Sequence, residues 1–172
     1  MGSSDRVRSL VTVSLLTAMA LALAALESAL PPLIPFPGVK LGLTNIITLI
    51  AFSLTKKRQV LLIVLIRLIL TGFVLGTFLA PAFWISCGGG LLSFFVMALC
   101  YGRRLISIVG VSLAGAAAHN IGQLTAVSLL LGNHGAFYFL AWLLLWSIPM
   151  GLFTGFAARS AVLALRRAGA GP

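Results

Sequence analysis

Long apolar runs separated by short basic or proline-rich segments set the pattern of this sequence. A membrane-spanning helix needs about 20 mostly apolar residues, so an apolar run bounded by charge, glycine or proline is a candidate span. Six runs qualify, although the second is short for a full crossing: Ser9–Leu26, Leu41–Leu54, Gln59–Leu79, Ala82–Tyr101, Leu105–Leu131 and Ala136–Leu163. The pattern predicts an all-α, polytopic membrane protein in which residues 1–172 form one bundle of six transmembrane helices.

The composition supports a membrane environment. Of the 172 residues, 60% are hydrophobic and only 8% are charged, and the mean hydropathy is +1.16. Polar residues this scarce do not cover the surface of a soluble domain of this size. We therefore expect a multi-pass protein of the cell membrane that has the lipid bilayer around it.

Basic residues lie between the apolar runs and predict the topology. With the N-terminus in the cytoplasm, ten of the twelve lysines and arginines fall at cytoplasmic positions: Arg6, Arg8, Lys56, Lys57, Arg58, Arg103, Arg104, Arg159, Arg166 and Arg167. This positive-inside bias requires an even number of spans and places both ends in the cytoplasm. Spacing of this kind argues against a nucleic-acid-binding patch. A cleavable signal peptide ending near Ala22–Ala24 is the alternative for the first run.

Scarce acidic residues exclude much chemistry. Asp5 and Glu27 are the only carboxylate side chains, whereas paired-carboxylate hydrolysis and carboxylate-rich magnesium sites need more acids than this. Cys87 and Cys100 lie on one predicted helix about 20 Å apart, so they do not pair with each other and are interpreted as packing residues. We expect no catalytic residues, no metal site, no cofactor and no enzymatic activity.

Polar residues within the apolar runs are the candidate binding residues. Arg67 lies about 12 Å of helical rise from the cytoplasmic end of its span, where an unpaired guanidinium costs several kcal/mol. It either extends to the inner headgroups or faces the bundle interior, where it suits a phosphate or carboxylate. His119 and Gln123 share a helical face, and Asn120 and Gln123 are also neighbours. These side chains either bind helices together or line a pocket.

Two further polar residues lie at a similar depth or nearer the outside. Asn45 is close to the outer end of the second run and Lys40 precedes it, while Glu27 is expected to pair with Lys40 or Arg67. The predicted substrate-binding set combines both groups: Lys40, Asn45, Arg67, His119, Asn120 and Gln123. Its excess of cationic and amide groups indicates a pocket, open to the outside, for an anionic or polar small molecule. The proline-rich segment 31–37 is predicted to be an external loop and a lid.

Several of these segments resemble the Gx transporter family, which is also described as heptaprenyl diphosphate synthase component I. The resemblance covers nearly the whole chain and is carried by Pro37–Asn45, by Arg67 with Gly72 to Gly76, by Phe83–Leu92 with its three consecutive glycines, and by Ala118–Gln123. That family is similar to the substrate-binding S-components of energy-coupling factor transporters, which are small six-helix proteins. In those relatives an Ala-xxx-Ala face of the first helix contacts the transmembrane coupling protein, so the resemblance implies Ala18 and Ala22, or Ala20 and Ala24, as the partner contact.

Three functions remain open from the sequence. The first is a substrate-binding subunit for uptake of a vitamin-like or cofactor-like solute. The chain has no Gly-xxxx-Gly-Lys-Ser/Thr loop, so ATP hydrolysis would come from partner ATPase subunits. The second is a non-catalytic membrane subunit associated with polyprenyl diphosphate synthesis. The third is a structural membrane protein without a ligand, for which the small residues spaced four apart serve only to pack the bundle.

Overall fold

The computed structural model describes residues 3–29 and 42–168, and this part of the chain is helical with no β-strand. The elements are α1 (Ser3–Ala29), α2 (Leu43–Leu54), α3 (Lys57–Val74), α4 (Pro81–Cys100), α5 (Ile108–Leu131), the 3₁₀ helix η1 (His134–Phe139) and α6 (Leu140–Arg167). The predicted all-α fold is confirmed. The proline-rich segment 31–37 and Lys40 lie outside the described residues.

Within the described residues, three stretches are long and apolar enough to cross a membrane: Arg6–Ala29, Pro81–Cys100 and the η1–α6 stretch His134–Arg167. The apolar helix α2, with 12 residues, is about 18 Å long and so too short for a hydrocarbon core of about 30 Å. Most of its side chains are buried, which makes α2 a half-length helix inside the bundle. The chain is therefore a helical membrane protein, while the count of six crossings stays a prediction.

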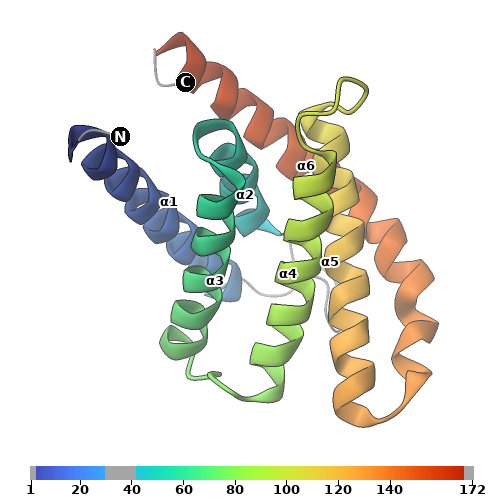
Figure 1. The fold of residues 1–172 in the computed structure, drawn as a ribbon. Coiled ribbons are helices and arrows are strands. Elements are labelled where there is room, and N and C mark those ends of the chain that lie inside the picture. The colour runs from blue at the N-terminus through green and yellow to red at the C-terminus, as the bar shows by residue number, and fades with distance from the viewer. Residues whose placement is uncertain (1–2, 30–41, 169–172) are drawn as a thin grey trace.

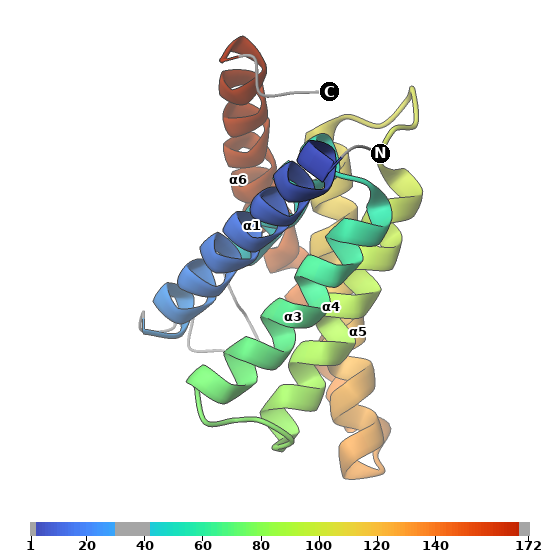
Figure 2. The same ribbon diagram turned by 60° about the vertical axis from the view of Figure 1, so that its left-hand side comes forward.

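The helices pack as a bundle in which α4 lies along α5 and α5 lies along α6 (Figure 1). On the other side α1 runs next to α3, as both views show (Figures 1 and 2), and it also contacts α2. The first turn of α1 and the last turn of α6 lie at the same end of the bundle. This shared end agrees with the predicted even number of crossings.

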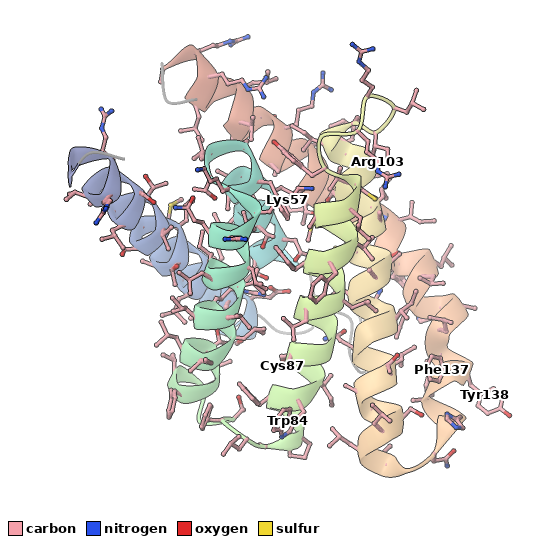
Figure 3. The ribbon with its side chains drawn as sticks, in the orientation of Figure 1. Lys57, Trp84, Cys87, Arg103, Phe137 and Tyr138 are labelled. Atoms are coloured by element: carbon pink, nitrogen blue, oxygen red, sulfur yellow. The ribbon has the colours of Figure 1, made fainter. Side chains whose placement is uncertain are left out.

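The two ends of the bundle differ in their side chains. Lys57 and Arg103 lie at one end, whereas Trp84 and Tyr138 lie at the other (Figure 3). We call these the basic end and the aromatic end. Apart from Arg67, every basic residue in the described part of the chain is exposed. Exposed cations concentrated at one end are expected of the cytoplasmic face of a membrane protein, and exposed aromatic rings are expected at a membrane interface.

Helix α3 ends at Val74, so the prediction that it extends to Leu79 is wrong. Gly76 has a φ of 65°, the left-handed conformation that glycine adopts without steric penalty. The amide of Thr77 donates to the Gly72 carbonyl (2.8 Å) and the amide of Gly76 donates to the Phe73 carbonyl (3.1 Å). This pair of bonds is a Schellman motif, which satisfies the last carbonyls and stops the helix.

The fifth and sixth helices also start later than predicted. Helix α5 begins at Ile108 rather than Leu105, because the Ser107 side chain caps it by accepting a hydrogen bond from the Gly110 amide (3.1 Å). The predicted start of the sixth helix, Ala136, lies within the 3₁₀ helix η1, and α6 runs from Leu140 to Arg167. Both corrections leave the order of the helices unchanged.

Glycines allow α4, α5 and α6 to pack closely. A Cβ atom added to Gly122 on α5 would lie 2.3 Å from the Gly88 carbonyl oxygen on α4, and one added to Gly155 on α6 would lie 2.9 Å from Cα of Val109 on α5. Neither contact has room for a side chain. Of the small residues spaced four apart in the sequence, Gly151 and Gly155 therefore pack α6 closely against α5.

Candidate binding site

A cavity of about 160 Å³ lies where α1 ends, α2 begins, and α3, α4 and α5 come together. Its α4 residues belong to the first turns of that helix, so it lies toward the aromatic end, at the level of Trp84 and Cys87 (Figure 3). Polar side chains form much of its lining: Glu27, Ser28, Thr44, Arg67, Thr71, Thr77, Ser86 and His119. Leu68, Leu75 and Phe83 add an apolar surface.

Arg67 is the most unusual of these residues. Only 8% of its surface is exposed, and its Nε atom is buried with no hydrogen-bond partner in the described part of the chain. Thr71, one turn farther along α3, also lines the cavity, and its Oγ1 atom likewise has no partner there. Because a buried arginine is not extended along the surface to the headgroups, the interior position is the one that the structure adopts. Two neighbouring residues that line the cavity thus each have a buried polar atom without a partner in the described part of the chain.

The run Gly88–Gly90 sets the shape of the site from α4. A Cβ added to Gly89 would lie 2.7 Å from Cγ of Gln123 and 2.9 Å from Cε1 of His119, and one added to Gly90 would lie 3.4 Å from Nη2 of Arg67. Gly88, the first glycine of this run, packs against the backbone of α5. Three consecutive glycines therefore bring α4 close to the side chains of both α3 and α5.

Glu27 lines the cavity from the end of α1. Its Oε1 atom accepts a hydrogen bond from the Gly42 amide at 2.7 Å, which joins α1 to the residue that precedes α2. Gly42 has a φ of 70°, a left-handed conformation that favours glycine. Glu27 is also near enough to Arg67 to attract it electrostatically. The sequence predicts that Glu27 pairs with Lys40 or Arg67. Glu27 and Arg67 line the same cavity and attract each other, and Lys40 lies outside the described residues.

The predicted binding residues do not all reach the cavity. Arg67 and His119 line it, whereas Asn45 and Gln123 are buried outside the lining. Gln123 packs beside His119 against Gly89, and its Oε1 atom has no hydrogen-bond partner in the described part. On α2 the lining residue is Thr44, next to Asn45. Lys40 lies outside the described residues.

Asn120 faces a different neighbour. Its Nδ2 atom donates to the Leu143 carbonyl on α6 at 2.9 Å, so the amide binds α5 to α6 instead of pointing into the cavity. The sequence left open whether these polar side chains join helices or line a pocket, and Asn120 joins two helices. Two consecutive residues of α5 thus differ in role, because His119 lines the cavity and Asn120 belongs to the packing interface.

Sequence reasoning missed the hydroxyl groups of the site. Thr71, Thr77, Ser86, Ser28 and Thr44 all line the cavity, yet none stands out in the sequence. The spacing of Arg67 and Thr71, four residues apart on one helix, is the signal that was present, because such residues share a face.

The two candidate alanine pairs of α1 face in different directions. Ala18 and Ala22 are exposed, whereas Ala20 is 1% exposed and Ala24 lines the cavity. Only the first pair is therefore on a surface that a partner could reach.

No curated protein matches the chain, and no solved structure matches it. A family model does match, over residues 16–161, and its description is heptaprenyl diphosphate synthase component I. This match extends from α1 to α6 and includes Arg67, the Gly88–Gly90 run and His119. The chain belongs to the heptaprenyl diphosphate synthase component I family.

Proposed function

We propose that this protein is a solute-binding subunit of the cell membrane, and that a small polar or anionic molecule binds in the cavity beside Arg67. The solute is cofactor-like or vitamin-like and enters from the aromatic end, which we assign to the outside. The protein itself is not an enzyme in this proposal. Its task is to bind the solute and present it for uptake.

The observation that carries the proposal is the buried Nε atom of Arg67, which has no hydrogen-bond partner in the described part of the chain. A buried arginine in a membrane costs several kcal/mol unless a counterion or hydrogen-bond acceptors compensate it. Here Nε of Arg67 and Oγ1 of Thr71 both lack a partner in the described part and both belong to residues that line the same cavity. A carboxylate or phosphate group in the cavity would accept hydrogen bonds from both, as guanidinium and hydroxyl groups donate to such oxygens.

The transport step requires partners. The sequence has no phosphate-binding loop for ATP, so we propose that separate ATPase subunits energise uptake through a transmembrane coupling protein. The exposed pair Ala18 and Ala22 supports α1 as the contact, since small residues spaced four apart allow two helices in lipid to approach closely.

A second candidate function follows from the family description. A heptaprenyl diphosphate synthase component suggests a non-catalytic membrane subunit that accompanies a soluble prenyl synthase. Prenyl transfer needs magnesium held by several acidic residues, and this chain has one aspartate and one glutamate. An accessory role is thus the form of this function that the sequence allows.

Thermal unfolding of the purified protein in detergent tests the leading proposal. A panel of vitamins, flavins, quinone precursors, prenyl phosphates and small carboxylates is added, and a ligand that binds the folded state raises the melting temperature. At about 100 times its dissociation constant, a ligand stabilises the fold by about 2.7 kcal/mol. We expect Arg67→Ala and His119→Ala to abolish the shift given by the true ligand.

Ser112→Ala is the matched control, because Ser112 is buried between α5 and α6 away from the cavity. It should keep the full ligand shift. Unchanged shifts in both cavity variants would show that the binding site is elsewhere. Co-purification with an ATPase module would favour uptake, and co-purification with a soluble prenyl synthase would favour the second function.

A further inference from the structure

The basic end of the protein has a large deficit of counterions. Twelve lysines and arginines face only two acidic side chains in the whole sequence, and one of these, Glu27, lines the cavity toward the other end. Most arginines of the basic end therefore have no carboxylate of their own chain to pair with. Their counterions come from the solvent, from the membrane or from another protein.

A groove of about 320 Å³ is present at this end, between the first turn of α5 and the last turns of α6. Arg159 and Arg166 are its two charged residues, and both are exposed. They are seven residues apart on α6, with Val162 and Leu163 between them, so all four lie on one face of the helix. The groove thus carries two arginines whose backbone positions are separated by about 10 Å of helical rise, with apolar side chains between them.

The floor and surroundings of the groove suit a lipid. Ile108, Val109, Val162 and Leu163 form the apolar floor. The Ser107 oxygen accepts the capping bond from the Gly110 amide, and the two arginines are the charged anion-binding groups of the groove.

We propose that this groove binds the phosphate group of an anionic phospholipid in the inner leaflet. The stretch ending at Arg167 is one of the candidate spans, so Arg159 and Arg166 lie where α6 leaves the membrane. Basic pockets between helices at the cytoplasmic surface bind lipid phosphates, because planar guanidinium groups donate two hydrogen bonds to one phosphate. An apolar floor beside two arginines matches a lipid, whose acyl chains are apolar and whose phosphate is anionic, and this favours the lipid over an acidic protein surface. The inference is independent of any solute in the Arg67 cavity.

Native mass spectrometry measures the binding directly. The detergent-solubilised protein is titrated with phosphatidylglycerol and, separately, with phosphatidylcholine. We expect the protein to prefer phosphatidylglycerol, and we expect the double variant Arg159→Gln, Arg166→Gln to lose about fivefold in affinity for each arginine removed. The control is Arg103→Gln, Arg104→Gln, which removes two exposed charges at the same end but outside the groove, and it should keep the preference. The double variant Arg159→Lys, Arg166→Lys should fold like the native protein and retain part of the preference for phosphatidylglycerol.

Three results would overturn the proposal. Equal losses in the control pair and the groove pair would mean that net charge alone attracts the lipid. The groove would be assigned to a protein partner if the native protein shows no preference for phosphatidylglycerol and the groove variant loses a co-purifying protein. The third result is that, in phosphatidylcholine, inorganic phosphate protects the protein from thermal unfolding as well as phosphatidylglycerol does. If the groove variant Arg159→Gln, Arg166→Gln loses that protection, the groove binds a soluble phosphate instead of a lipid.

Discussion

The α5–α6 interface and the cavity between α3 and α4 handle buried polar groups in opposite ways. Between α5 and α6 two polar contacts cross the interface: Asn120 donates to the Leu143 carbonyl, and Ser112 is 2.8 Å from Thr154. Beside α3, Arg67 and Thr71 have buried atoms without partners in the described part. Unsatisfied polar groups in a membrane are expensive. The comparison teaches that one region of the bundle is built to stay closed, while the other keeps hydrogen-bonding capacity for something else.

The largest expected effect comes from the tightest backbone contact of the bundle's described part, which lies between α4 and α5. Gly122→Ala would place a Cβ 2.3 Å from the Gly88 carbonyl oxygen. Backbone atoms do not move aside as a flexible side chain does, so α4 and α5 must separate. We expect a loss of about 3 kcal/mol in the free energy of unfolding, the upper part of the range for overpacked interiors. Unfolding in mixed detergent, followed by circular dichroism, measures it.

Gly110→Ala is the matched control on the same helix. Its added Cβ would meet Cγ2 of Ile106 at 3.1 Å, a terminal methyl group that can move. Because alanine favours helix over glycine by about 1 kcal/mol, this variant should be near neutral or more stable. Equal destabilisation by both substitutions would refute the claim that close backbone packing of α4 and α5 is special.

The next largest effect separates two adjacent residues of α5. Asn120→Ala removes the bond to the Leu143 carbonyl and should lower stability by about 0.6 to 1.7 kcal/mol, the range for hydrogen bonds between membrane helices. It should leave the ligand shift intact. His119→Ala should do the reverse, abolishing the ligand shift with a smaller change in the stability of the empty protein. Melting curves with and without the ligand identified in the panel measure both quantities.

Identical behaviour of the two variants would contradict the comparison. If both lose the ligand shift, the binding site extends to α6 and the cavity beside Arg67 is only part of it. If neither does, α5 contributes packing alone. A double variant adds a check, because independent roles predict additive effects on stability.

The fold was predictable from the sequence to the level of helices but not of their ends. Six apolar runs correspond to six α-helices, because hydrophobicity over about 20 residues is a strong signal. The ends depend on short-range bonds: Gly76 stops α3 through a Schellman motif, and Ser107 delays the start of α5. Neither residue is distinguishable by composition from other glycines and serines that lie inside helices.

The site was predictable only where a residue is costly in lipid. Arg67 and His119 stand out in apolar runs, and both line the cavity. Thr71 does not stand out, because a threonine in a helix commonly donates to the carbonyl four residues earlier. Thr17 and Thr125 do so here, to Val13 and Ile121. Only the packing around α3 reveals that Thr71 lacks this bond, and only the position of α6 reveals why Asn120 faces away from the cavity.

The smallest expected effect tests whether the closed region owes its stability to polar contacts or to fit. Thr154 Oγ1 is 2.9 Å from the Met150 carbonyl, to which it donates, so the Ser112 hydroxyl donates to Thr154. A double-mutant cycle of Ser112→Ala and Thr154→Val should give a coupling of about 0.6 kcal/mol. This is well below the loss expected for Gly122→Ala at the α4–α5 contact, so we expect this hydrogen bond alone to contribute little to holding α5 and α6 together. A coupling as large as the glycine effect would make the hydrogen bonds the main reason that α5 and α6 stay together.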